Sequence, residues 1–293
     1  MVLTTVLLMV ALDPPLPGGP DPDPDPETEV EALLGDVRTR KHEIVVSEEP
    51  RVVLSALEAG PEEAPVTILF VHGFGGWKEQ WLPQMRCLSA GARTIALDLR
   101  GHGESSKPRS AYGVEELVRD LEAAVEALRV KRPFVLVGHS FGAALVASYA
   151  AEHPDQIEGL VLISPSSDYR MSWIYRWGFY VPDAIFDAVM GLLNRIRPTF
   201  LAPAYVLKAL YFQGLSAWDA EEVLPRVKAP TRVIRPRWDP LFSSREVRRV
   251  VELLPDAEEI VIASASHMLM RARPDRVNEA LAEFLGLPCR SDL

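Results

Sequence analysis

The stretch VLVGHSFGAAL, residues 135–145, passes from a run typical of a buried strand to a helix within a few residues. The helix is predicted over Phe141–Glu152, ending near Pro154. Gly138 and Gly142 lie two positions on either side of Ser140, so strand and helix can approach without a side chain between them. A side chain at the apex of such a turn projects above the sheet, often in strained backbone geometry. The pattern therefore predicts an exposed Ser140 at the carboxyl end of a strand.

The rest of the chain alternates between strand and helix patterns. The expected helices besides Phe141–Glu152 are Gly113–Leu128 and Asp275–Leu285, each with an apolar stripe at helical spacing. Eight apolar runs are expected strands: His42–Val46, Val52–Leu57, Val66–Val71, Thr94–Leu97, Phe134–Val137, Leu160–Ile163, Thr231–Ile234 and Glu259–Ile262. This alternation predicts an α/β fold, a mostly parallel eight-stranded sheet flanked by helices.

One region interrupts the alternation after the sixth strand. Residues 166–225 contain no convincing strand and read as short helices broken by prolines. Twelve of the 23 aromatic residues of the chain lie between Ser166 and Trp218, which indicates a separate apolar core and a pocket wall. Insertions of this kind cover the carboxyl ends of parallel strands, where ligands bind. We predict a helical cap over 166–225 and a core formed by 29–165 and 226–293.

The charge and cysteine content exclude several classes of protein. The net charge is −10 and no basic stripe is present, so binding to nucleic acid is not expected. Cys87 and Cys289 lie far apart in the sequence and match no metal-binding spacing. A disulfide is therefore not expected, and a reducing compartment is compatible with the sequence.

Residues 1–28 differ in composition from the rest. The first 12 residues are nearly all apolar, and Asp13–Glu27 is rich in proline. The apolar run is shorter than the roughly 20 residues of a membrane-spanning helix, and no basic residue precedes it as in a secretory signal. We expect an apolar tail followed by a stiff tether and a cytoplasmic protein, with export or peripheral membrane contact as the alternative.

A serine hydroxyl needs a base and an orienting carboxylate before it can act as a nucleophile. His267 follows the last strand and is the expected base, and Asp239 follows the seventh strand and is the expected acid. The order Ser140, Asp239, His267 is typical of a nucleophile turn of this kind. Asp168, after the sixth strand, is the alternative acid. The backbone N–H groups of Phe74 and Phe141 are the expected oxyanion donors.

These segments resemble the α/β-hydrolase fold superfamily, in its capped esterase and lipase-like branch. The resemblance covers about Thr39 to Leu287. It rests on HGFGG at His72–Gly76, DLRGHGES at Asp98–Ser105, GHSFG at Gly138–Gly142, WDP at Trp238–Pro240 and SHM at Ser266–Met268. The resemblance implies that Asp98 and His102 support the site without taking part in the chemistry. The chain departs from it at Arg235–Arg237, where relatives often have glycine, and at Ser266, where they often have glycine before the histidine.

The expected activity is that of a serine hydrolase that cleaves a carboxylic ester, or a related acyl bond, of a largely apolar small molecule. No cofactor or metal is expected. Carbon–carbon bond hydrolysis, acyl transfer and perhydrolysis use the same three residues and stay open, as does a non-catalytic ligand-binding role. Epoxide hydrolase and dehalogenase chemistry is disfavoured, because by resemblance it uses aspartate at the position of Ser140. The residues expected to line the pocket are His72, Gly73, His139, Trp173, Trp177, Trp238 and Met268.

Membrane contact through the cap is a further hypothesis. It rests on an aromatic-rich stretch of the cap that could dock on lipid, with Trp173, Trp177, Phe179, Tyr180 and Ile185. A cap face that is buried explains the same residues and is favoured.

Overall fold

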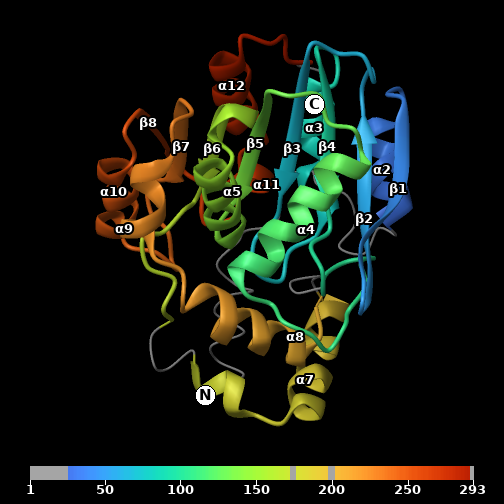
Figure 1. Cartoon of the computed structure of the whole chain (residues 1–293), viewed down its shortest axis with the longest axis vertical. Helices are drawn as coiled ribbons and strands as arrows, with labels where there is room; N and C mark the ends of the chain where they lie inside the picture. Colours follow the sequence, from blue (N-terminus) through green and yellow to red (C-terminus); the bar gives the residue numbers. More distant parts are fainter. Residues whose placement is uncertain (1–25, 172–175, 197–201, 291–293) are drawn as a thin grey trace.

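A computed structural model describes residues 26–171, 176–196 and 202–290. Its centre is one eight-stranded sheet with the order β1-β2-β4-β3-β5-β6-β7-β8 (Figure 1). The pairs β1–β2 and β2–β4 are antiparallel and the other pairs are parallel. All eight predicted strands are confirmed: β1 (Thr39–Glu48), β2 (Arg51–Ala59), β3 (Val66–Val71), β4 (Ala92–Leu97), β5 (Phe134–His139), β6 (Ile157–Ile163), β7 (Thr231–Pro236) and β8 (Ala257–Ile262).

Helices cover both faces of the sheet, which is why its central strands are apolar on both sides. One face packs against α4 (Val114–Ala127), α5 (Phe141–Glu152) and α10 (Ser244–Leu253). The other face packs against α2 (Pro26–Leu34), α3 (Leu82–Leu88), α11 (Leu269–Ala272) and α12 (Pro274–Leu285). The three predicted helices correspond to α4, α5 and α12. The predicted α/β architecture is therefore confirmed.

The region between β6 and β7 carries only helical elements in its described residues. They are η3 (Trp177–Tyr180), α7 (Asp183–Ile196), α8 (Ala204–Ala209), η4 (Leu210–Leu215), α9 (Ala220–Val223) and η5 (Leu224–Arg226). We keep the name cap for residues 166–225. In Figure 1, α7 and α8 lie below the sheet, with α7 at the extreme end of the long axis of the molecule.

The amino-terminal prediction falls mostly outside the described residues. Helix α2 begins at Pro26, so the last residues of the predicted tether are helical, and residues 1–25 are not described. Within the described part of the chain, no helix is both long and apolar enough to cross a membrane.

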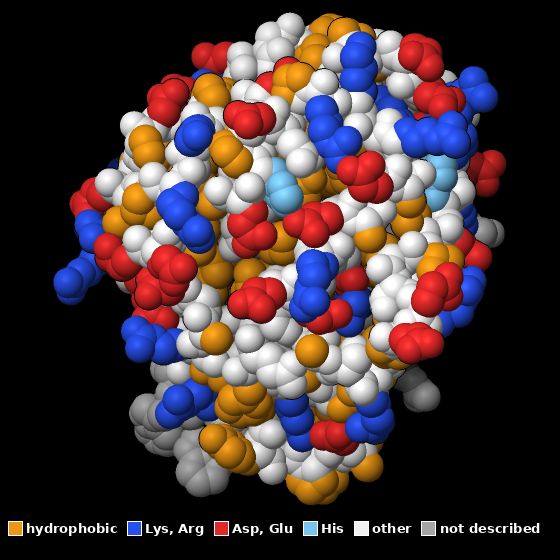
Figure 2. Space-filling view, in the orientation of Figure 1, with side chains coloured by type: hydrophobic (Ala, Val, Ile, Leu, Met, Phe, Trp, Pro, Cys, Tyr) orange, Lys and Arg blue, Asp and Glu red, His pale blue; other side chains and the backbone are white. Residues whose placement is uncertain are grey.

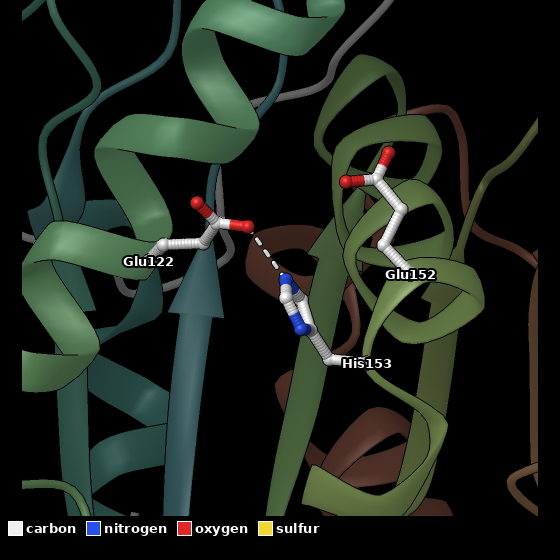
Figure 3. Close-up of side chains that lie close together, drawn as sticks. All are labelled: Glu122, Glu152 and His153. Carbon is white, nitrogen blue, oxygen red and sulfur yellow. Dashed lines mark hydrogen bonds and ion pairs between the residues drawn. The ribbon is translucent and has the colours of Figure 1, made fainter.

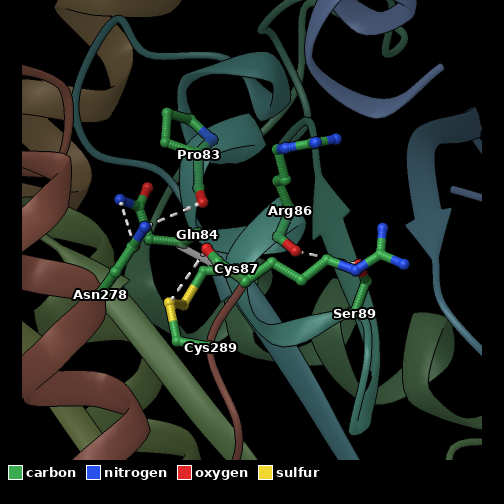
Figure 4. The surroundings of a disulfide bond; sticks show 8 residues. Pro83, Gln84, Arg86, Cys87, Ser89, Asn278 and Cys289 are labelled. Atoms are coloured by element: carbon green, nitrogen blue, oxygen red, sulfur yellow. Dashed lines mark hydrogen bonds between the residues drawn. A yellow bond between two sulfur atoms is a disulfide. The ribbon is translucent and has the colours of Figure 1, made fainter. Parts of the chain in front are cut away.

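The expectation that the cysteines stay unpaired is wrong. Cys87 in α3 and Cys289 after α12 form a disulfide across 202 residues of sequence (Figure 4). The pairing follows from tertiary packing, because α12 lies against α3 and brings the carboxyl-terminal segment to Cys87. The N–H of Arg290 also donates to the carbonyl of Cys87 at 3.0 Å. Spacing in the sequence could not show this proximity.

Candidate active site

Ser140 occupies the turn between β5 and α5 in a strained backbone conformation. Its φ of 52° and ψ of −120° lie where residues with a β-carbon are rare, at a cost of roughly 1–3 kcal/mol. A β-carbon on Gly138 would lie 2.4 Å from the carbonyl oxygen of Gly142, so the close approach of strand and helix needs glycine there. The N–H of Ser140 donates to the carbonyl of Ile163 on β6 at 2.9 Å. The neighbouring strand therefore holds the turn in place.

Asp239 and His267 lie side by side after the last two strands of the sheet. Nδ1 of His267 is 2.9 Å from Oδ2 of Asp239. The other carboxylate oxygen accepts from the N–H groups of Leu241 at 2.8 Å and Phe242 at 3.3 Å. Burial alone raises the pKa of Asp239, but the contact with His267 and the two N–H donors outweigh it, so its pKa is lowered. The carboxylate is therefore charged at neutral pH and fixed toward the imidazole.

The backbone of His267 is tied to the turn that carries Ser140. Its carbonyl accepts from Nε2 of His139 and from Oγ of Ser164, both at 3.0 Å. The rings of His139 and His267 have centroids 4.8 Å apart, and Phe242 packs edge-on against His267 at 5.3 Å. Because His139 directly precedes Ser140, these contacts tie the backbone of the predicted base to the turn that carries the predicted nucleophile.

Asp168, the alternative acid, has a different partner. Its carboxylate pairs with the guanidinium of Arg170, with Nη2 to Oδ2 at 2.7 Å. It also accepts from the N–H of Arg170 at 2.8 Å. The side-chain hydrogen bond to Arg170 is the main cause of its lowered pKa. The structure thus places Asp239, and not Asp168, on His267.

The loop after β3 lies directly against the serine turn. A β-carbon on Gly73 would lie only 3.0 Å from Cβ of Ser140, so this glycine allows the close contact. Phe74 follows in the same loop, and Phe141 is the first residue of α5. The two residues predicted to supply oxyanion donors therefore come from segments that flank Ser140.

Three buried histidines surround this loop and are held neutral. Burial lowers the pKa of His72 to about 4, and that of His102 and His139 to about 3. His72 accepts the N–H of Leu99 at Nε2, and His102 accepts the N–H of Gly75 at Nε2. Each nitrogen that accepts a backbone N–H must lack a proton. His72 and His102 therefore support the loops around the site, as the resemblance implies for His102, whereas His139 holds the carbonyl of His267. Their expected place in the lining of a pocket stays a prediction for His72 and His139.

A buried charge cluster, which the sequence did not reveal, joins the loops after β3 and β4. Nζ of Lys78 lies 2.8 Å from Asp98, 2.6 Å from Glu104 and 2.9 Å from Glu79. The N–H of Lys78 also donates to Asp98 at 2.7 Å. Burial lowers the pKa of Lys78, but Asp98 and Glu79 outweigh it and raise the pKa. Asp98 was singled out by its motif, whereas no local pattern marks Lys78 as its partner.

Tyr169 is a second residue that sequence reasoning missed. Its buried hydroxyl donates to the carbonyl of Ser140 at 2.7 Å. Its ring packs edge-on against Phe141, Trp218 and Phe242. The cap therefore takes part in holding the serine turn. The only sequence signal was its membership of the aromatic-rich cap.

The remaining residues predicted to line the pocket differ in their burial and in how far the structure describes them. Met268 is half-buried and packs against the apolar cluster on the α12 face of the sheet. Trp238 is 59% exposed beside Asp239, so it lies at the rim of the site rather than in its interior. Trp173 lies outside the described residues, and only the backbone of Trp177, in η3, is described.

One group in the described part of the chain has side chains of the metal-binding type within reach of one another. Glu122 of α4, Glu152 of α5 and His153 lie together, and Figure 3 shows His153 directed at Glu122. Nε2 of His153 lies 2.5 Å from Glu122, an ion-pair distance that explains the contact without a metal. Since this group lies at the far end of α5, roughly 18 Å from Ser140 along the helix, it belongs to no step at the serine.

Comparisons with known proteins agree with this architecture. Residues 66–184 match the model of the family described as alpha/beta hydrolase fold. Human protein ABHD8 is 28% identical over 249 residues, covering 76% of this chain and 56% of its own length. The chain thus spans just over half the length of that relative. A putative carbamate hydrolase, RutD, from Caulobacter sp. (strain K31) is 26% identical over 266 residues, covering 78% of this chain and 94% of its own.

A solved structure shows the same fold. The thermophilic esterase from Thermogutta terrifontis superposes with a TM-score of 0.72 at 22% identity, covering 84% of this chain and 98% of its own. The strand order, the strained serine turn and these matches lead to one conclusion. The chain has the α/β-hydrolase fold, and residues 66–184 match the family of that name, in agreement with the resemblance that the sequence motifs carry.

Proposed function

We propose that the protein is a serine hydrolase that cleaves a carboxylic ester, or a related acyl bond, of a largely apolar small molecule. The hydrogen bond between His267 and Asp239, beside a strained serine turn, is the observation that supports it most strongly. A carboxylate on Nδ1 fixes the tautomer in which Nε2 can accept a proton. If His267 and Asp239 only stabilised the fold, neither this tautomer of His267 nor a strained Ser140 at the same edge of the sheet would be required.

In the proposed reaction, Oγ of Ser140 attacks the substrate carbonyl carbon while Nε2 of His267 takes the hydroxyl proton. Asp239 stabilises the resulting imidazolium. The N–H groups of Phe74 and Phe141 stabilise the negative charge on the carbonyl oxygen. The bond to the leaving alcohol then breaks, and His267 returns the proton to that oxygen. A water molecule, deprotonated by His267, then attacks the acyl–serine ester. The bond between the acyl carbon and Oγ of Ser140 breaks, His267 returns the proton to Oγ, and the acid is released.

The aromatic side chains of the cap favour the proposal that the substrate is apolar. Phe179 stacks on Tyr211 with centroids 5.0 Å apart and meets Phe74 of the proposed oxyanion loop edge-on at 6.1 Å. Aromatic carbon therefore extends from the cap to the loop beside Ser140. The Caulobacter relative is named a putative carbamate hydrolase, and a carbamate is cleaved at a carbonyl carbon, whereas a Mycobacterium tuberculosis relative is named epoxide hydrolase A.

A series of nitrophenyl esters with acyl chains of increasing length tests this proposal. We expect steady turnover that rises with chain length to an optimum, and loss of turnover in Ser140→Ala. Asp168→Asn is the matched control, because Asp168 pairs with Arg170 and not with His267, and should keep most of the activity. Equal turnover in Ser140→Ala and the unaltered protein would contradict the proposal.

The disulfide supports an oxidising compartment as the place where the protein works, because disulfides rarely persist in the cytosol. This favours the exported alternative over the cytoplasmic expectation. If the protein is extracted without reductant, both cysteines should resist alkylation until a reductant is added. Alkylation of both without reductant would contradict this proposal.

A further inference from the structure

The tip of the cap exposes an apolar surface. Eight large hydrophobic side chains of the described residues are exposed, and four of them lie between residues 180 and 212. They are Tyr180 (69% exposed), Ile185 (56%), Leu192 (60%) and Phe212 (46%), and we call them the cap patch. The rings of Tyr180 and Phe212 lie 6.2 Å apart. Figure 2 shows apolar and basic side chains gathered at the lower end of the molecule, over α7 and α8.

Helix α7 is apolar on the side that faces solvent as well as on the side that faces the cap. Phe186 and Met190 point inward, where Met190 is buried. Ile185, Ala188 and Leu192 follow at spacings of three and four residues and are all exposed, so they form a second apolar stripe. A helix of a soluble protein normally turns charged or polar side chains outward, so this second stripe indicates a partner.

The acidic side chains of α7 are engaged with the rest of the cap. Asp183 pairs with Lys208, and Asp187 accepts the N–H of Ala204 at 2.7 Å. Between Arg176 and Leu215 the sequence has four basic and two acidic residues, a net charge of +2 in a chain of net charge −10. At physiological salt, charges more than about 8 Å away are largely screened, so the local positive charge decides what the tip attracts.

A line of aromatic rings connects the cap patch with the candidate active site. Tyr180 contacts Phe212, Phe212 contacts Phe179 at 6.1 Å, and Phe179 contacts Phe74 at 6.1 Å. Phe74 lies in the loop against Ser140. The aromatic packing of the cap patch is therefore continuous with the loop beside Ser140.

We infer that the cap patch docks on a phospholipid bilayer surface that contains anionic headgroups. Exposed aliphatic side chains would enter the headgroup boundary, Tyr180 would lie at the interface, and the net positive charge of the segment from Arg176 to Leu215 would attract the phosphates. Among the elements that the structure describes, α7 lies at the extreme end of the long axis, where the patch can meet a flat surface (Figure 1). A second copy of the chain is the less suitable partner, because it would bring two positively charged tips together.

Co-sedimentation of the full-length protein with vesicles tests this inference. The vesicles are made of phosphatidylcholine alone or mixed with phosphatidylglycerol. We expect binding to the mixed vesicles, weaker binding to phosphatidylcholine, and a loss of at least tenfold in partitioning for the double variant Ile185→Glu, Leu192→Glu. The matched control is Val45→Glu with Val261→Glu, two exposed strand residues outside the cap, which should bind as the unaltered protein does.

The measurement is independent of the proposed hydrolase activity. Ser140→Ala should bind vesicles fully, so failure of the chemistry and failure of docking are distinguishable. Circular dichroism and urea unfolding verify that the cap variants are folded. Absence of binding to mixed vesicles, or equal binding by the Ile185→Glu, Leu192→Glu variant, would overturn the inference. A dimer in light scattering that the same variant abolishes would instead assign the patch to a second copy and also overturn it.

Discussion

The loops around Ser140 and the cap are held together by different kinds of contact. In the loops, Lys78 and Asp98 pair in a buried charge cluster, and the three neutral histidines hold backbone groups. The cap packs aromatic rings and exposes Ile185 and Leu192 to solvent. Directional contacts can fix atoms to within a few tenths of an ångström, whereas apolar packing accepts many shapes. In the proposed function, the loops carry the chemistry and the cap selects the substrate and the surface.

The largest effect is expected on catalysis when the imidazole loses its carboxylate or is removed. In His267→Ala and Asp239→Asn, turnover of a nitrophenyl ester should fall by on the order of 10⁴-fold, because the base is absent or in the wrong tautomer. Initial-rate measurements with unchanged circular dichroism verify this. A loss below tenfold in both variants would remove these residues from the chemistry.

Acid should destabilise the folded protein through the buried histidines of the loops around Ser140. His72, His102 and His139 are neutral in the folded protein, with pKa values of about 4, 3 and 3, while in the unfolded chain they take up protons near pH 6.5. Below about pH 6.5 the unfolded state therefore binds more protons, and each histidine removes about 1.4 kcal/mol of stability per pH unit until its folded pKa is reached. The lowered pKa of Asp239 adds a loss only as pH falls below 3.8 toward its folded value.

Urea unfolding across pH 7 to 4.5 measures this loss as the number of protons taken up on unfolding. We expect an uptake that approaches three protons from these histidines. His153→Gln is a suitable control, since His153 is partly exposed outside the loops and its removal should leave most of the uptake in place. An uptake below one proton would show that the three histidines are not held neutral.

Removing the cation of the buried cluster should be costly although it touches no reacting group. Lys78→Met leaves Asp98 and Glu79 buried without their partner, a change that costs roughly 3–5 kcal/mol of unfolding free energy. Arg119→Met removes an exposed partner of Glu116 and should change stability by about 0.5 kcal/mol or less. Equal effects of the two variants in urea unfolding would contradict the structural role of the cluster.

Removal of the disulfide tests a region that is remote from both the loops and the cap. Cys289→Ala opens the link to α3 and should lower the unfolding free energy by about 2–5 kcal/mol, since the bond closes a loop of 202 residues. Ester turnover at 25 °C should stay unchanged, because the link lies on the α3 and α12 side of the sheet. A loss of turnover with little loss of stability would show that the link acts on the site.

The strands and the serine turn could be predicted from the sequence, because each is marked by a few neighbouring residues. Ser140, Asp239 and His267 could be selected for the same reason, since each lies in a short motif just after a strand. The contacts that hold the site were not predictable in this way. Lys78 and Asp98 are 20 residues apart, Tyr169 and Ser140 are 29 apart, and Cys87 and Cys289 are 202 apart. Such pairs depend on how the helices pack, which one sequence does not show. Among the residues of the membrane hypothesis, Tyr180 and Ile185 are exposed, contrary to the favoured expectation of a buried cap face, whereas Phe179 is buried as that expectation requires.

Reaction with a fluorophosphonate tests the central claim most directly, because the reagent labels only a serine whose proton a base can take. We expect one phosphonyl group per chain, located on Ser140 by peptide mass analysis. The adduct should be absent in Ser140→Ala and should form far more slowly in His267→Ala. A folded protein that stays unlabelled, or one labelled equally in Ser140→Ala, would contradict the assignment of Ser140 as an activated nucleophile.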